Sequence, residues 1–242
     1  MTTAAVIIIG DEILSGKVRD DNAPLLITRL RERGVTLARL VVVGDSLEDI
    51  ATEVAHCSSR YDVVITSGGI GPTHDDVTVA AVAAALGRAV VRDRELEAMV
   101  RSFWGDRVND AALRLADVPD GGRLIRSHDR LLPLVAVENV YLLPGVPKLF
   151  VAKLPALLAE LHGSVPRQAS LYLRCDETSV AATLARVAAE EPTVHIGSYP
   201  RLGHADYQVW VTVEADDPAP VRRTVARLVE LIPPGDLVRV ET

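Results

Sequence analysis

Three mainly apolar runs, each followed by a helical pattern, constrain the fold of the first half of this chain more than any other feature. The runs cover residues 4–9, 36–43 and 62–67, and the patterns after them predict helices over 22–33, 47–57 and 77–86. Strands as uniformly apolar as residues 4–9 are buried on both faces, and a parallel sheet with helices on each side provides that environment. We therefore expect an α/β fold, a three-layer αβα sandwich around a mostly parallel sheet.

The remaining elements of this part follow from shorter patterns. Asn22 is expected to cap the first long helix, with Pro24 near its start and Gly34 beyond its end. The segments 96–104 and 109–116 read as helices. Residues 134–143 predict two short strands or one hairpin that turns at 138–139, and a further helix is expected to end near Leu161.

A change of pattern near residue 165 predicts a second domain. The stretch 162–166, HGSVP, reads as a linker between domains at 1–164 and 167–242. Beyond it we expect strand, helix, strand, strand, helix and a last strand. The series Tyr207, Val209, Val211 and Val213 alternates with polar or large residues, which predicts a sheet with one buried face and hence a small α+β domain.

Charge and composition exclude several classes of function. The net charge is −7 and neither half is basic, which argues against a nucleic-acid partner. The first apolar run ends at Asp11 and Glu12, and no run approaches the roughly 18 apolar residues of a membrane span. Cys57 and Cys175 have no spacing typical of zinc or disulfides. We expect a cytoplasmic protein with no membrane partner.

The run ITSGGIGPTHDD at residues 65–76 is the strongest functional motif. Ligands of doubly wound sheets bind beyond the carboxyl ends of the strands, where this loop follows a strand. Its glycines allow backbone amides to approach an anion closely. The loop lacks the spacing of a Walker A motif and of the GxGxxG dinucleotide fingerprint.

Carboxylates follow each of the three predicted strands and should converge on one crevice; they are Asp11, Glu12, Asp45, Asp75 and Asp76. Acidic side chains beside a phosphate site would repel the ligand unless a divalent cation lies between them. Magnesium-like ions take one or two carboxylates together with substrate phosphate oxygens. An alternative is that Asp75 or Asp76 caps the helix at 77, and that Asp45 caps the helix at 47.

Several motifs resemble the molybdopterin-binding-like superfamily. GDEILSGKVRDDNAPLL, TSGGIGPTHDDVT and LLPGVPKLF are similar to segments of molybdenum-cofactor biosynthesis proteins and of the N-terminal domain of CinA-type proteins. In the second part, LYLRCDETSVAATLARV, IGSYPRLGHADYQVWVTVE and LIPPGDLV resemble the segments that follow this domain in eukaryotic FAD synthase. The region 126–137 lacks the glycine-rich stretch of CinA sequences, which places the chain nearer to the FAD synthase branch.

The resemblance implies a function and a site. It implies a homo-oligomer that hydrolyses a dinucleotide such as FAD or ADP-ribose to AMP and a second phosphate, with a divalent metal, Mg or Co. The alternatives are a protein that binds molybdopterin without hydrolysis, or a non-catalytic regulatory module. We expect Asp45 and Asp76 to be catalytic and Asp11, Asp75 and Asp76 to bind the metal. The expected phosphate- or nucleotide-binding residues are Gly10, Ser67, Gly68, Gly69, Gly71, Thr73, Pro144 and Gly145. In the second domain, Gly197-Ser198-Tyr199-Pro200 is the segment most suspected of reaching a ligand, with a turn at a strand end as the plainer interpretation.

Overall fold

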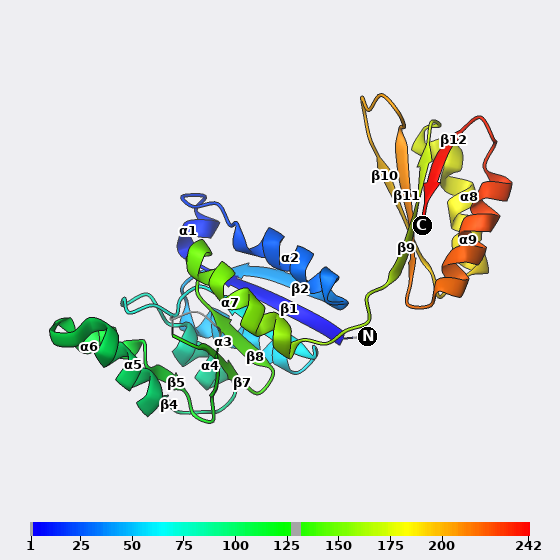
Figure 1. The fold of residues 1–242 in the computed structure, drawn as a ribbon. Helices are drawn as coiled ribbons and strands as arrows, with labels where there is room; N and C mark the ends of the chain where they lie inside the picture. The colour runs from blue at the N-terminus through cyan, green and yellow to red at the C-terminus, as the bar shows by residue number, and fades with distance from the viewer. Residues whose placement is uncertain (1, 127–131) are drawn as a thin grey trace. The chain divides into compact units, whose positions relative to one another are not determined.

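The computed structural model describes residues 2–126 and 132–242, and the chain divides into two compact units, Met1–Ser164 and Val165–Thr242 (Figure 1). The first unit begins with β1 (Thr2–Ile9), α1 (Asp11–Leu14), α2 (Asn22–Glu32), β2 (Val35–Val43), α3 (Leu47–Ser58), β3 (Val63–Ser67) and α4 (Thr78–Ala85). It continues with β4 (Val90–Arg92), α5 (Arg94–Trp104), η1 (Gly105–Arg107), α6 (Asp110–Arg114), β5 (Asp117–Pro119), β6 (Arg123–Ile125), β7 (Leu134–Val137), β8 (Val140–Leu143) and α7 (Pro147–Glu160).

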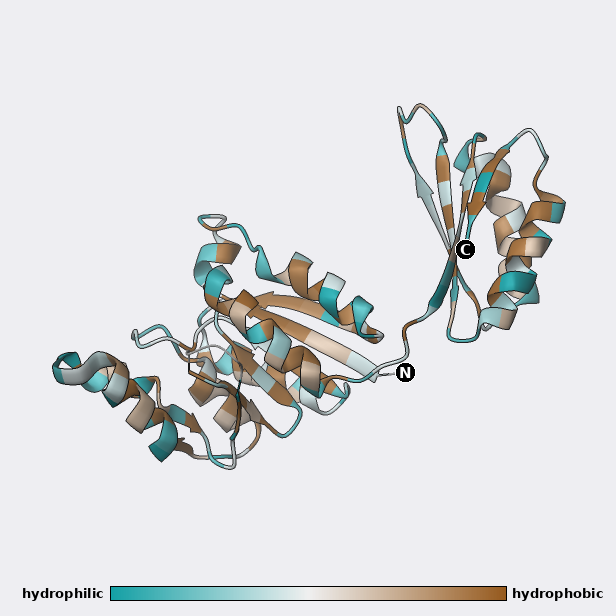
Figure 2. Cartoon of the chain, viewed as in Figure 1, coloured by the Kyte–Doolittle hydropathy of each residue, from teal (hydrophilic) through white to brown (hydrophobic). Residues whose placement is uncertain are grey.

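The main sheet of this unit is six-stranded in the order β2-β1-β3-β8-β7-β6. The pairs β1–β2, β1–β3 and β3–β8 are parallel, whereas β7 and β6 are added antiparallel at one side. The mostly parallel α/β sheet expected from the sequence is therefore confirmed. Figure 2 shows these central strands in the colour of hydrophobic residues.

The uniformly apolar sequence of β1 follows from burial on both faces of the sheet. Ala4, Val6 and Ile8 pack in one core with side chains of α2 and α7. Ala5 and Ile7, which alternate with them, pack in a second core with side chains of α3 and α4. A strand whose two faces are both covered has no position for a polar residue.

The expected cap of α2 and the alternative caps of α3 and α4 all differ in the structure. Asp21, not Asn22, occupies the N-cap position of α2, and the backbone amide of Asn22 is bound instead by the carboxylate of Asp20. Ser46 caps α3, so Asp45 does not. The helix α4 begins at Thr78 without a side-chain cap, because the amide of Thr78 donates to the carbonyl of Gly69. Neither Asp75 nor Asp76 caps it.

The hairpin of β7 and β8 turns at 138–139 as predicted, and Glu138 has a φ of 51° there. Three short strands, β4, β5 and β6, were not predicted. β4 and β5 form a separate two-stranded sheet beside α5 and α6, and each is only three residues long. Strands so short have too few residues to show an alternating pattern.

The second unit contains β9 (Arg167–Leu173), α8 (Glu177–Glu190), β10 (His195–Pro200), β11 (Val209–Ala215), α9 (Pro218–Leu231) and β12 (Leu237–Glu241). Its antiparallel sheet has the order β10-β11-β9-β12, and one face packs on α8 and α9. The predicted α+β class and order of elements are confirmed. Gly197-Ser198-Tyr199-Pro200 lies within β10, so its interpretation as a turn was wrong.

Among the residues that the structure describes, none of the helices has the length and apolar composition required to cross a membrane.

Candidate active site

The glycine-rich loop begins where β3 ends, at the carboxyl edge of the parallel sheet. Gly68 and Gly69 have φ values of 115° and 64°, a backbone conformation that residues other than glycine rarely adopt. The amide of Gly68 donates to the carbonyl of Leu143 on the neighbouring strand β8. Thr78 closes the loop, because its hydroxyl donates to the carbonyl of Gly68 and its amide to that of Gly69. The loop is therefore held at both ends.

Asn22 joins this loop to the loop between β8 and α7. Its buried side-chain amide donates to the hydroxyl of Ser67 at 3.1 Å and to the carbonyl of Gly145 at 2.8 Å. A Cβ added to Gly145 would lie 3.2 Å from the Cα of Gly68, so the two loops are in close contact. Asn22 was expected only to cap a helix; its bonds to Ser67 and Gly145 make it a positioning residue of the candidate site.

We expect Asn22→Ala to destabilise the protein by about 1–3 kcal/mol, because buried acceptors lose their donor. It should also weaken ligand binding, because the two loops are no longer joined. Asn139→Ala is the matched control: its side chain bonds Ser58 and the carbonyl of Tyr61 at the opposite end of the sheet. Chemical denaturation and ligand titration of both variants test this, and equal loss of binding in both would contradict a positioning role.

Two of the predicted acidic residues contact each other. The amide of Asp11 donates to the carboxylate of Asp45 at 2.9 Å, and the amide of Asp45 donates to the carboxylate of Asp11 at 3.3 Å. In the glycine-rich loop, Asp76 accepts hydrogen bonds from the amide of Thr73 at 2.8 Å and from its hydroxyl at 2.5 Å. These bonds fix the loops after all three strands.

The charges of these loops influence one another. Burial raises the pKa of the Asp45 carboxyl above its ordinary value, and the nearby carboxylates of Glu12, Asp11 and Asp75 raise it further. The hydrogen bond from Asp11 opposes this shift. In such surroundings the charged carboxylate is stabilised by a nearby cation, and without one it is protonated more readily.

A cavity of about 740 Å³ opens beside the glycine-rich loop. Glu12, Asp45, Asp75 and Asp76 line it together with Gly68, Gly69, Gly71, Pro144 and Gly145. Of the remaining predicted site residues, Gly10, Asp11, Ser67 and Thr73 do not line it. Ser67 is buried against Asn22, whereas Asp11 and Thr73 hold Asp45 and Asp76 in place.

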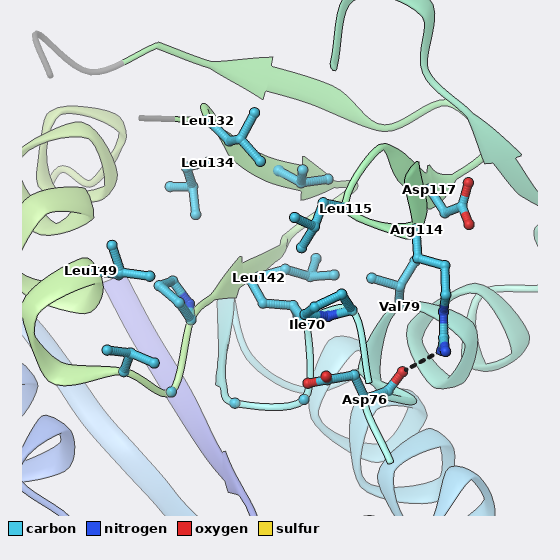
Figure 3. A pocket seen from close by; sticks show the side chains of 18 of the residues that line it. Ile70, Asp76, Val79, Arg114, Leu115, Asp117, Leu132, Leu134, Leu142 and Leu149 are labelled. Atoms are coloured by element: carbon cyan, nitrogen blue, oxygen red, sulfur yellow. Dashed lines mark hydrogen bonds between the residues drawn. The ribbon is translucent and has the colours of Figure 1, made fainter. Parts of the chain in front are cut away.

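The rest of the cavity wall is mainly apolar and was not predicted. Leucine side chains from several segments surround the space beside Asp76 and Arg114 (Figure 3). Phe103 and Trp104, at the end of α5, also line it, with ring centroids 4.5 Å apart. The apolar lining residues of α5, α6 and the segments around β7 are Leu96, Met99, Phe103, Trp104, Leu115, Leu132, Pro133, Leu134 and Val135.

Two cationic side chains line the cavity. Arg114 donates to the backbone carbonyl of Asp76 at 3.4 Å (Figure 3). Lys153 of α7 is 5% exposed. Both lie outside recognisable motifs, in helices whose patterns indicated only packing. The lining of the cavity thus combines carboxylates, backbone amides and two cationic side chains with many apolar side chains.

The donor set limits the kind of metal site that is possible. Among the described residues, no group of three His, Cys, Asp or Glu side chains is arranged to hold a metal ion. The oxygen donors that line the cavity suit a hard divalent ion that binds one or two carboxylates and takes other ligands from a phosphate. They do not form a complete protein site.

Comparison with known proteins agrees with this geometry. The probable molybdopterin binding domain family matches residues 5–162, which include the whole cavity lining. The chain belongs to this molybdopterin-binding domain family. Residues 167–241 match a second family, the middle domain of FAD synthase. Both parts of the resemblance seen in the sequence are therefore confirmed.

Relatives with this domain include proteins of different lengths. The chain is 35% identical to a probable FAD synthase of Caenorhabditis briggsae over 95% of its own length, and 33% identical to that of Caenorhabditis elegans. It spans about half the length of these two proteins, 49% and 50%. The crystal structure of the protein CinA from Thermoplasma acidophilum is 33% identical, with a TM-score of 0.61, and covers 66% of this chain and 97% of its own.

Proposed function

We propose that the cavity binds a dinucleotide pyrophosphate and hydrolyses its phosphoric anhydride with the help of a divalent ion. The observation that supports this most directly is the lining of one cavity by four carboxylates and by the glycine-rich loop. Carboxylates alone would repel an anion, and exposed amides alone would bind a phosphate without activating water. Together with a cation they suit phosphoryl chemistry.

The apolar wall supports FAD as a better substrate than ADP-ribose. A volume of about 740 Å³ is within the usual range for small-molecule sites, and most of the described lining residues are apolar. The isoalloxazine ring of FAD is a large planar group that would bury against Leu, Phe and Trp side chains. The terminal ribose of ADP-ribose is polar and would leave this wall exposed to water.

The residues divide the reaction between them. A divalent ion, when bound, would polarise the pyrophosphate and lower the pKa of an attacking water. Asp45 accepts the proton of that water, which its raised pKa favours. The amides of Gly69 and Gly71 have no hydrogen-bond acceptor in the described part of the chain, so they are available for a phosphoryl oxygen. Gly68 is not, because its amide binds Leu143. Water and FAD thereby give AMP and FMN.

A substrate panel tests the proposal. FAD, NADH, ADP-ribose and CoA are incubated with the protein and magnesium, cobalt or EDTA, and the products are separated by chromatography. We expect AMP from FAD with either metal, less from ADP-ribose, and none with EDTA. Failure to release a nucleoside monophosphate from any of these compounds would exclude the proposed hydrolysis.

A second candidate is a protein that binds molybdopterin without hydrolysing a dinucleotide. The family match over residues 5–162 favours it, because that family is described as a probable molybdopterin binding domain. Both candidates use the same cavity. Tight molybdopterin binding without release of AMP would identify the second. The homo-oligomer implied by the resemblance remains a prediction in either case.

A further inference from the structure

The outer face of the C-terminal sheet contains a row of aromatic residues that crosses neighbouring strands. Val209, Val211 and Val213 of β11 are buried against the helices, so Trp210 points to the opposite face. Trp210 is paired with Tyr199 of β10 and with Tyr172 of β9. Tyr172 is in turn paired with Arg239 of β12. Tyr199, Trp210, Tyr172 and Arg239, the aromatic row, thus span all four strands.

Ring contacts extend this row with residues of the β10–β11 loop. Tyr199 and Trp210 have ring centroids 5.1 Å apart, and the guanidinium of Arg239 lies 3.8 Å from the ring centre of Tyr172. Tyr207 contacts Tyr172 edge to face at 4.8 Å. The alternating pattern had placed Tyr207 with the buried valines. It lies on the outer face instead, because β11 begins only at Val209.

The packing at Gly197 leaves Tyr199 flat on the sheet. A Cβ added to Gly197 would lie 2.8 Å from the hydroxyl of Tyr199 and 2.7 Å from that of Thr212. The side chain of Tyr199 therefore covers the glycine, although the residue is 45% exposed. Next to it, the indole nitrogen of Trp210 is buried and has no hydrogen-bond acceptor among the described residues.

On the outer face Arg239 pairs with Glu241, as the arginines of the helices pair with glutamates, but Arg201 differs from them. On the helical side, Arg186, Arg223 and Arg227 form ion pairs with Glu190, Glu191 and Glu230. On the sheet, Arg201 lies 5.7 Å from the ring centre of Trp210 and has no carboxylate partner in the described part of the chain. An exposed guanidinium beside a ring is suited to a phosphate attached to a stacked base.

We propose that the aromatic row binds the planar heteroaromatic ring of a nucleotide by stacking, with Arg201 contacting its phosphate. Aromatic side chains on an open sheet, with Arg beside them, accept any base because every base has a π face. The ring belongs to a free nucleotide, because a net charge of −7 disfavours the many phosphates of a nucleic-acid strand. The residues of this site all belong to the second unit, and the proposal does not depend on hydrolysis in the first.

Tryptophan fluorescence of the full chain tests the proposal. The chain has two Trp, and Trp104→Phe leaves Trp210 as the single reporter. AMP, hexa-adenylate and ribose 5-phosphate, which lacks the base, are titrated into this variant. We expect AMP to change the emission and ribose 5-phosphate to leave it unchanged. Adding Tyr199→Ala should weaken AMP binding about tenfold, as loss of one stacking ring does.

The matched control is Leu202→Ala, because Leu202 is fully exposed in the same β10–β11 loop but outside the aromatic row. It should leave AMP binding unchanged. A response to hexa-adenylate alone would overturn the assignment to a free nucleotide, because it would place the stacked ring in a nucleic-acid strand. Equal responses to AMP and ribose 5-phosphate, or equal effects of Tyr199→Ala and Leu202→Ala, would overturn the proposal. Emission that changes only with protein concentration would also overturn it, by showing that a second copy covers this face.

Discussion

Asp76→Asn is expected to lower AMP release from FAD about a hundredfold or more, with the fold unchanged. Asparagine retains an oxygen that can accept the hydrogen bonds from Thr73, so the loop should keep its conformation. It removes the negative charge that would bind the divalent ion beside the pyrophosphate. Initial rates with saturating magnesium, together with the circular dichroism spectrum, measure both parts of the expectation.

Asp120→Asn provides the matched control for charge. Asp120 lies in the turn after β5 and does not line the cavity, so its substitution should leave the rate unchanged. Full activity of Asp76→Asn, with a metal still required, would remove Asp76 from the mechanism. Asp45 and Glu12 would then be the candidates for binding the metal.

Gly68→Ala should cause the largest loss of stability among substitutions in the glycine-rich loop. The added Cβ would lie 2.1 Å from the backbone carbonyl oxygen of Ile9, and the φ of 115° is unfavourable for alanine. Because the contact is with backbone of β1, the loop and the strand must separate. We expect a loss of about 3 kcal/mol or more in the free energy of unfolding, measured by urea denaturation, together with loss of ligand binding.

Gly16→Ala separates the two causes of this loss. Gly16 also has a positive φ, 70°, but a Cβ there would meet no atom within 4 Å. It should therefore show only the cost of the backbone conformation, about 1 kcal/mol. Equal losses in the two variants would mean that the close approach of Gly68 to Ile9 is unimportant.

The sequence predicted the structure best where a local pattern has a single physical explanation, as in the buried strand β1 and the glycine-rich loop. The continuous apolar run of β1 allowed the parallel sheet to be predicted, because only strands covered on both faces lack polar positions. The position of the glycine-rich loop followed from the end of β3. The pairing of Asp11 with Asp45 could be anticipated, because parallel strands end at the same edge of the sheet.

Other parts of the site depend on contacts between distant segments. Asn22 appeared to be a helix cap, and nothing nearby in the sequence indicates its bonds to Ser67 and Gly145. The apolar residues of α5 that line the cavity cannot be distinguished by pattern from those that pack in a core. The cross-strand row of Tyr199, Trp210 and Tyr172 depends on sheet register, which alternation within a single strand does not specify.

Two small hydrophobic clusters hold α5 and α6, whose side chains form one wall of the cavity, and they indicate where a ligand would enter. Leu96, Ala116 and Val118 form one cluster, and Val100, Ala112 and Leu113 form the other, each far smaller than the cores of the main sheet. Cooperative units with few buried contacts open at a lower free-energy cost than the rest of a protein. If the cavity binds a large flat molecule as proposed, we expect it to enter by local opening of this wall without disturbing the sheet.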